Sequence, residues 1–148
     1  KGDNFFGQFA KMSKFLPFLP VIGPNVKFQP IYVGDVAQAI TNILSSKKSF
    51  SNVYELGGPE IYTFYNLLSL MLENLGRKRI LIKINPILMI LPGYFLNFLP
   101  KPPFTSDQMK LLMYDNIVNP EKPGLKDLEV KPTKLEILLP ELLKFFKV

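Results

Sequence analysis

Residues 28–40 read Phe-Gln-Pro-Ile-Tyr-Val-Gly-Asp-Val-Ala-Gln-Ala-Ile, and this stretch decides the fold class. Its first six residues are rich in β-forming types and are followed by Gly34, which predicts a strand. Pro30 favours an edge or terminal position, because proline cannot donate to a ladder. Asp35 is expected to cap the following helix, with Gln38 at its third position as in a capping box. A strand that runs directly into a helix favours an α/β protein.

A second strand-to-helix unit follows. Residues 52–56 predict a strand that ends at the Gly57-Gly58 pair, where glycine permits a tight turn. Thr63 is expected to cap a helix whose apolar residues recur every 3.6 positions, and Gly76 is expected to end it. Residues 80–84 alternate in the manner of a short strand.

Helices are also predicted on either side of these units. Before them, Phe5, Phe9, Met12 and Leu16 form one helical stripe that Pro17 and Pro20 should terminate. After them, capping boxes predict a helix over residues 105–114 and a last helix that begins after Thr133. The last helix contains Pro140, which should kink it or split it into two pieces. Few strands followed mainly by helices indicate part of an α/β sheet and a helical subdomain.

Composition removes many kinds of chemistry. The chain has 148 residues, of which 47% are hydrophobic, and this is enough to form one real core. It has no Cys and no His, which excludes disulfides, thiol nucleophiles, iron-sulfur clusters, Cys or His zinc sites and Ser-His-Asp triads. We therefore expect no metal site and no catalytic residue that depends on imidazole or thiol.

The net charge of +6 would suit an anionic partner, but its distribution does not indicate nucleic acid. The one dense basic run, residues 77–79, has no stacking aromatics interleaved with it and is typical of a solvated connection. Residues 84–99 are apolar but too short and too interrupted by proline to span a membrane. They favour a buried or partner-facing segment, with contact at a membrane surface as the alternative.

Two sets of phrases in the sequence carry a resemblance to known proteins. The phrases Asp3-Asn-Phe-Phe6, Phe28 to Ala37 and Tyr54-Glu-Leu-Gly-Gly-Pro59 resemble the second half of extended and atypical short-chain dehydrogenases/reductases. More narrowly, residues 28–40 together with residues 105–112, 115–118 and 124–128 make the chain similar to the NAD(P)-binding accessory subunit of respiratory complex I and its bacterial relatives. The resemblance runs over nearly the whole chain.

The resemblance implies a Rossmann half that this sequence lacks. No G-x-G-x-x-G or G-x-x-G-x-x-G phosphate-binding turn is present, and no tyrosine is followed four residues later by lysine. The simplest interpretation is a C-terminal fragment or truncated product. We expect residues 1–60 to be the remnant of the Rossmann-like sheet with its helices, and residues 61–148 to be a mainly helical substrate-side or docking subdomain.

Candidate site residues follow from the resemblance alone. Asn4 and Phe5 would follow the strand that ends beside the cofactor and are the candidate cofactor-binding residues. Gln29 and Tyr32 would face the substrate-side cleft. NAD or NADP is implied for the full-length protein, whereas the fragment alone should bind neither and be inactive. Phe5 lies on the apolar stripe of its helix and is better explained as a core residue, whereas for Gln29 and Tyr32 a structural role and a site role are equally well supported. Asp35 is more simply a helix cap than a catalytic group.

Two functions from different classes remain open on sequence grounds. One is the C-terminal portion of an accessory subunit that stabilises a membrane-associated NADH:quinone oxidoreductase without catalysis, located in the cytoplasm at the inner membrane face. The other is half of a sugar-nucleotide epimerase, dehydratase or reductase, for which Arg or Lys should face the diphosphate. A non-catalytic NADP sensor is a third. The expected partners are the missing Rossmann half, complex I subunits and a second copy of the chain, but not nucleic acid.

Overall fold

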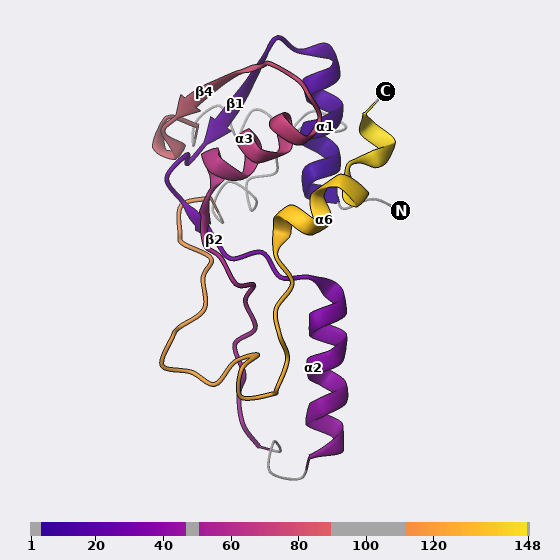
Figure 1. Ribbon diagram of the computed structural model, residues 1–148. Helices are drawn as coiled ribbons and strands as arrows, with labels where there is room; N and C mark the ends of the chain where they lie inside the picture. The colour runs from indigo at the N-terminus through magenta and orange to yellow at the C-terminus, as the bar shows by residue number, and fades with distance from the viewer. Residues whose placement is uncertain (1–3, 47–50, 90–111, 148) are drawn as a thin grey trace, which may run out of the picture.

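The computed structural model describes residues 4–46, 51–89 and 112–147 of the chain (Figure 1). In chain order its elements are α1 (Asn4–Phe15), β1 (Phe18–Ile22), β2 (Lys27–Phe28), α2 (Val33–Ser45), β3 (Tyr62–Thr63), α3 (Phe64–Asn74), β4 (Ile80–Ile84), the 3-10 turn η2 (Pro86–Met89), α6 (Leu135–Leu142) and the 3-10 turn η3 (Lys144–Phe146).

Two small sheets connect the elements. β1 pairs with β4 in parallel, with Phe18 opposite Ile80 and Ile22 opposite Ile84. β2 pairs with β3 antiparallel, and a single parallel bridge joins Phe28 to Asn116. The parallel pair requires a crossover, which α2 and α3 provide between β1 and β4. Mixed helices with a parallel pair fit the expected α/β class.

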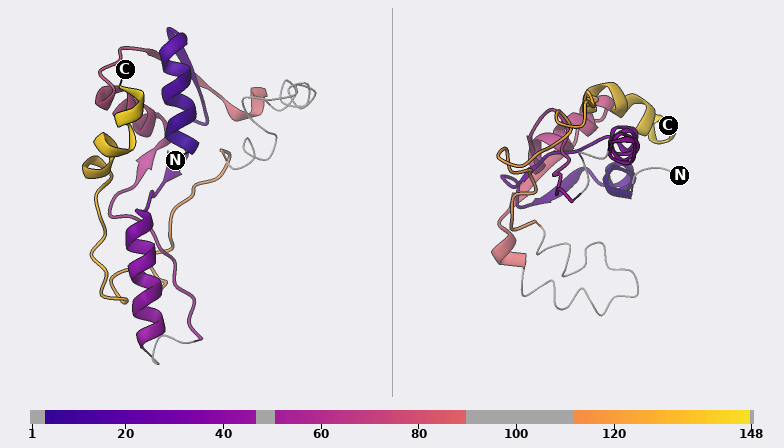
Figure 2. Two further views of the ribbon diagram at one scale, coloured as in Figure 1. Left: turned by 90° about the vertical axis from the view of Figure 1, so that its right-hand side faces the viewer. Right: turned by 90° about the horizontal axis from the view of Figure 1, so that it is seen from below.

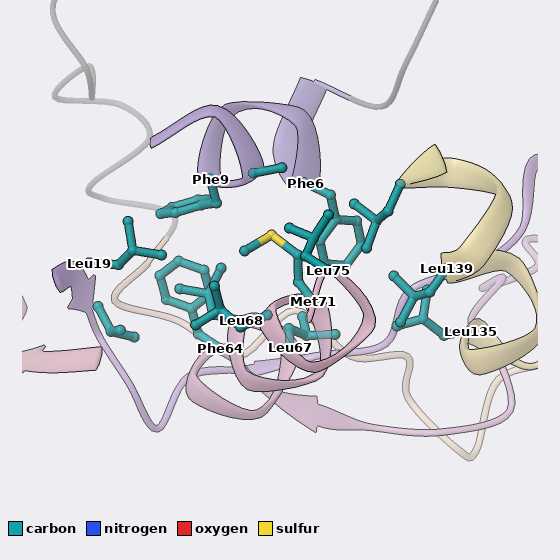
Figure 3. Packing of buried hydrophobic residues seen from close by; sticks show 14 of the residues in the cluster. Phe6, Phe9, Leu19, Phe64, Leu67, Leu68, Met71, Leu75, Leu135 and Leu139 are labelled. Atoms are coloured by element: carbon teal, nitrogen blue, oxygen red, sulfur yellow. The ribbon is translucent and has the colours of Figure 1, made fainter. Parts of the chain in front are cut away.

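The main core lies between α1, α3, α6 and one face of the β1–β4 sheet (Figure 3). Leu19 and Val21 of β1 are fully buried there, because alternate residues of a strand face the same side. Phe9 of α1 meets Phe64 of α3 edge-on, with ring centroids 5.6 Å apart. Close packing of this kind holds the helices against the sheet.

A second, smaller cluster lies along α2, which projects away from the main core (Figures 1 and 2). Ala39 packs there against Leu125, Leu128 and Val130 of the long connection before α6. The molecule is therefore elongated, with the main core at one end and α2 at the other.

The α3 region agrees with the sequence prediction in detail. The Thr63 hydroxyl accepts a hydrogen bond from the Asn66 N–H at 3.1 Å, as an N-cap does. Gly76 has φ +65°, and the Arg77 N–H reaches the Leu72 carbonyl at 3.0 Å, which completes a Schellman C-cap. β4 also forms over residues 80–84 as predicted.

The two strands predicted beside glycine did not form at the predicted length. Only Lys27–Phe28 pairs as β2, and residues 29–32 run extended into α2 without a ladder. Residues 52–56 form no strand and instead contact the connection before α6. The Glu55 N–H donates to the Pro123 carbonyl at 3.0 Å, and the Glu55 carboxylate accepts from the Asn119 N–H at 2.8 Å, so this segment is held by residues far away in sequence.

β1 was missed because Pro20 was interpreted as a helix stop. α1 does end at Phe15, before Pro17, but Pro20 lies inside the strand that follows. The Gly23 N–H donates to the Ile84 carbonyl, and the Ile80 N–H donates to the Pro17 carbonyl. The backbone N–H and C=O groups of the odd-numbered residues of β1 therefore point toward β4. The backbone nitrogen of Pro20 points to the opposite edge of the strand, so its missing N–H removes no hydrogen bond between β1 and β4.

Three helix details are corrected. The buried stripe of α1 consists of Phe6, Phe9, Ala10 and Ser13, whereas Leu16 is exposed. Asp35 and Gln38 do not cap α2, because the helix begins two residues earlier, at Val33. The cap of α6 is Lys134, without a side-chain bond; this helix continues through Pro140 to Leu142, and a short 3-10 turn follows. Most of the helix predicted over residues 105–114 lies outside the described residues.

Candidate functional site

A cavity of about 490 Å³ lies between the beginning of α1, the extended segment before α2, and α6. Phe6 of α1, Leu67 of α3 and Leu135 of α6 contribute apolar side chains to its lining. Among the described residues that line it, none is charged. The polar groups at its wall belong to Gln29, Tyr32, Asn116 and Thr133. Such a surface suits an uncharged and largely apolar group.

Gln29 lies at this cavity, but its amide is occupied by the backbone. Its Nε2 donates to the Gly58 carbonyl at 2.7 Å, and its Oε1 accepts from the Val118 N–H at 3.1 Å. The side chain therefore joins three segments that are distant in sequence. These contacts support a structural role for Gln29, which holds the wall of the cavity in place.

The glycine pair is explained by the same contacts. A Cβ on Gly58 would lie 1.9 Å from the Pro30 carbonyl oxygen, and one on Gly57 would lie 2.6 Å from Gln29 Cδ. The space that glycine leaves open is filled by this chain's own atoms. The pair thus does not provide a cradle for a pyrophosphate, and the described residues contain no other pair of adjacent glycines.

Tyr32 also lines the cavity and occupies the N-cap position of α2. Its carbonyl accepts from the N–H groups of Asp35 and Val36, and its side chain is 40% exposed. The ring lies over Gly34, where a Cβ would come within 2.3 Å of a ring carbon. Tyr32 thus borders the cavity from a partly exposed position.

Asn4 and Phe5 form the beginning of α1, directly before Phe6 of the cavity wall. The chain therefore brings the start of α1 and the segment with Gln29 and Tyr32 to the same cavity. Thr133 and Asn116 border it as well and were not anticipated, because no local pattern marks them. Their position at the cavity depends on contacts with segments that are far away in sequence: Thr133 bonds to Asp35, and Asn116 bonds to Lys27.

Asp35 holds α2 to the beginning of the last helix. Its two carboxylate oxygens accept from the Thr133 N–H at 2.6 Å and from the Thr133 hydroxyl at 2.9 Å. The residue is 7% exposed. Both residues thus have a different role from the one the sequence suggested: neither caps its own helix, and together they connect two helices.

A second polar cluster lies where β3 meets α6. The Tyr62 hydroxyl lies 2.6 Å from Glu60 Oε2 and 2.5 Å from Glu136 Oε1, and Lys134 Nζ lies 3.1 Å from Glu60 Oε1. The hydrogen bonds from Tyr62 and Lys134 lower the pKa of Glu60. Burial, with the two carboxylates, raises the pKa of Tyr62, and Glu60 raises the pKa of Lys134. The cluster fastens α6 to β3.

The basic run at residues 77–79 is not simply solvated. Arg77 donates to the Ala10 carbonyl at 2.7 Å and to the Ser13 hydroxyl at 2.9 Å, and it also bonds to the Phe146 carbonyl. Arg79 Nε donates to the Ser13 carbonyl at 2.8 Å. Cations at the last carbonyls of a helix are stabilising, so these arginines hold the end of α1 in place.

Within the described parts of the chain, no group of three or more acidic, His or Cys side chains is arranged to hold a metal. A search of the same residues also finds no helix with the length and hydrophobicity needed to cross a bilayer.

Comparison with solved structures defines the class. The fold resembles that of dTDP-4-dehydrorhamnose reductase from Bacillus anthracis, solved with NADP, at a TM-score of 0.50 and 14% identity; the match covers 87% of this chain and 42% of the reductase. At that identity the likeness concerns the fold. The chain therefore has the α/β fold of part of a Rossmann-like reductase, as predicted. No family model matches it.

Sequence comparison gives the nearer relationship. The mitochondrial NADH dehydrogenase (ubiquinone) 1 alpha subcomplex subunit 9 of Arabidopsis thaliana is 32% identical over 145 residues, covering 90% of this chain and 36% of the relative. The Dictyostelium discoideum protein of the same name is 26% identical over 148 residues, covering 98% and 42%. The Neurospora crassa NADH-ubiquinone oxidoreductase 40 kDa subunit is 25% identical over 126 residues, covering 84% and 34%.

The chain is thus a relative of the subunit 9 proteins of NADH dehydrogenase, which confirms the resemblance seen in its sequence. It spans about two fifths of the length of these curated relatives.

Proposed function

We propose that this chain is the substrate-side portion of an NAD(P)-binding accessory subunit of a membrane-associated NADH:quinone oxidoreductase. The observation that carries the proposal is similarity, over 90% and 98% of the chain, to proteins of a plant and an amoeba that are named subunit 9 of the NADH dehydrogenase (ubiquinone) 1 alpha subcomplex. The role would be structural: the subunit would stabilise the assembly and not turn over a substrate of its own.

The remaining length of the protein would supply the Rossmann half. An exposed apolar stripe on α2 supports this arrangement: Val33, Ile40 and Leu44 are 74%, 50% and 71% exposed, and they recur at helical spacing with Ala37. Such a stripe is normally buried against another element. We expect the Rossmann half to cover it.

NAD or NADP would be held mainly by that other half. The glycine pair of this chain is filled by its own side chains and backbone, so a pyrophosphate site here has no support. The cavity at Gln29 and Tyr32, next to the start of α1, would instead close over the nicotinamide end. The host determines the compartment: cytoplasmic in a bacterium, mitochondrial in a eukaryote, and peripheral at the membrane in either case.

The alternative is a sugar-nucleotide enzyme. Its diphosphate substrate calls for arginine or lysine in the cleft. The described lining of the cavity holds neither, and both arginines of the chain bond to backbone carbonyls at the end of α1. The distribution of cations therefore favours the accessory subunit.

Affinity purification of the tagged full-length protein from gently solubilised membranes of its host tests the proposal. We expect core subunits of the NADH:quinone oxidoreductase to be recovered in near-equal amounts with it. Recovery of the protein alone, together with turnover of a nucleotide sugar by the pure protein, would establish the alternative instead.

A further inference from the structure

One end of the molecule exposes large apolar side chains. Phe15, at the end of α1, is 80% exposed, Phe18 of β1 is 46% exposed and Ile80 of β4 is 70% exposed. They lie together, because Phe18 is opposite Ile80 in the sheet and the Ile80 N–H donates to the Pro17 carbonyl at 3.2 Å. We name Phe15, Leu16, Phe18 and Ile80 the apolar end. It lies opposite α2 in the elongated molecule (Figures 1 and 2).

The excess positive charge of the chain gathers on the same elements. Residues 4–22 and 76–87 contain six Lys and Arg residues and no Asp or Glu. The other 12 cationic residues are matched in number by all 12 acidic ones, so these two segments account for the whole net charge of +6. Lys11 and Lys14 lie on α1 beside Phe15, and Lys78 lies two residues before Ile80; all three lysines are exposed.

The apolar end is also held rigidly. Arg79 Nε donates to the Ser13 carbonyl, two residues before Phe15, and Arg77 donates to Ala10 and Ser13. These bonds tie the end of α1 to the beginning of β4, which are more than sixty residues apart in sequence. The exposed side chains therefore project from a fixed frame and not from a loose chain end.

We propose that the apolar end rests on the surface of a bilayer that contains anionic phospholipids, with Phe15, Phe18 and Ile80 entering the headgroup region. Apolar side chains rimmed by lysine fit such a surface, because anionic lipids attract the cations and the lysine stems extend along the apolar boundary. A protein partner is less well matched, since lysine is depleted at protein interfaces. A second copy would meet the same positive charge and be repelled.

The test is co-sedimentation of the purified full-length protein with vesicles, which requires no other subunit. Vesicles of phosphatidylcholine mixed with phosphatidylglycerol are compared with vesicles of phosphatidylcholine alone. The test variants are Phe15→Ser with Ile80→Ser, and Lys14→Glu with Lys78→Glu. The matched controls are Ile137→Ser with Phe145→Ser, at 69% and 72% exposure, and Lys122→Glu with Lys126→Glu.

We expect binding to the anionic vesicles, weaker binding to the neutral ones, and a loss of at least about tenfold in affinity for both test variants. The controls should bind like the unaltered protein, and circular dichroism should show all variants folded, because the changed residues are exposed. Equal binding of test and control variants, or no binding to anionic vesicles, would overturn the proposal. The proposal would also be overturned if the protein did not bind vesicles and the test variants instead lost binding to an acidic protein partner. Recovery of oxidoreductase subunits, which tests the proposed function, is measured separately.

Discussion

Gly58 shows how a single position can be fixed by a neighbour that is far away in sequence. Its Cα lies so close to the Pro30 backbone that a Cβ would overlap the carbonyl oxygen at 1.9 Å. Gly76 has the opposite character: nothing lies within 4 Å of its Cβ position, and its φ of +65° is the reason for glycine. Two glycines of one chain thus answer two different requirements, one of space and one of backbone conformation.

Gly58→Ala should therefore cost roughly 3 kcal/mol of unfolding free energy, because backbone must move to accept the methyl group. Gly76→Ala should cost only about 1–2 kcal/mol, the penalty of a left-handed residue. Urea unfolding of both variants measures the difference. A Gly58→Ala protein as stable as the Gly76→Ala protein would contradict the packing described for the glycine pair.

The hydrogen bonds between Asp35 and Thr133 are a second contact in which single residues connect distant parts of the chain. Asp35→Ala removes both bonds to Thr133 and should lower the unfolding free energy by about 2 kcal/mol, since hydrogen bonds to charged groups are the stronger kind. Thr133→Val removes only the hydroxyl bond and should cost about 1 kcal/mol, whereas Thr133→Ser should be nearly neutral. Chemical denaturation gives this order; equal losses in Asp35→Ala and Thr133→Val would refute it.

At the scale of elements, the success of sequence prediction follows the range of the interactions involved. α3 was predicted from Thr63 to Gly76 because its caps and its apolar stripe depend only on residues close together in the sequence. β1 was missed and residues 52–56 were assigned wrongly because strands are selected by partners: β1 pairs with residues some sixty positions later. Of the residues at the cavity, Gln29 and Tyr32 were predicted because they lie in one short segment of the sequence. Asn116 and Thr133 were not, since only the tertiary structure brings them to the cavity.

The cluster between β3 and α6 should make stability depend on pH. Because the pKa of Tyr62 and that of Lys134 are raised on folding, their contribution is present below pH 10 and is lost as the pH rises through the folded values. Because the pKa of Glu60 is lowered from 4.5, its contribution is present above that value and is lost in acid. The structure is thus expected to be weakest at both extremes.

Tyr62→Phe should flatten the alkaline side of this profile, because phenylalanine carries no phenol to titrate in the unfolded chain. Thermal unfolding midpoints between about pH 9 and pH 11 are the measurement, with Tyr65→Phe as the control of the same chemistry. The midpoint should fall with pH in the unaltered protein and in the control, and less so in Tyr62→Phe. Identical slopes in all three would mean that the Tyr62 cluster does not couple to folding.

At the scale of the whole molecule, the elongated shape leaves its two ends with different surfaces. The α2 end carries the exposed stripe that we assign to the Rossmann half, and the opposite end carries the basic apolar surface. The sequence predicted that a part was missing, from the absence of a phosphate-binding turn. It could not predict which face of α2 is exposed, since that depends on how α2 rotates against residues 124–130.

Ile40→Ser with Leu44→Ser should change the stability of the two forms of the protein by different amounts. In the 148-residue chain alone, both residues are exposed, so the change should be nearly neutral for stability and should reduce self-association. In the full-length protein the same change should lower stability by about 2 kcal/mol or more, because the stripe would be buried. Sedimentation velocity and urea unfolding of both forms measure this; neutrality in the full-length protein would mean that α2 faces solvent there.

The central proposal is that this chain belongs to a subunit which stabilises an NADH:quinone oxidoreductase. The most direct measurement is the amount of full-size oxidoreductase, resolved on native gels and stained for NADH oxidation, in host cells with and without the gene. The account predicts that the full-size band is lost or replaced by smaller assemblies in its absence, and that it returns when the gene is restored. An unchanged band in cells without the gene would contradict the account.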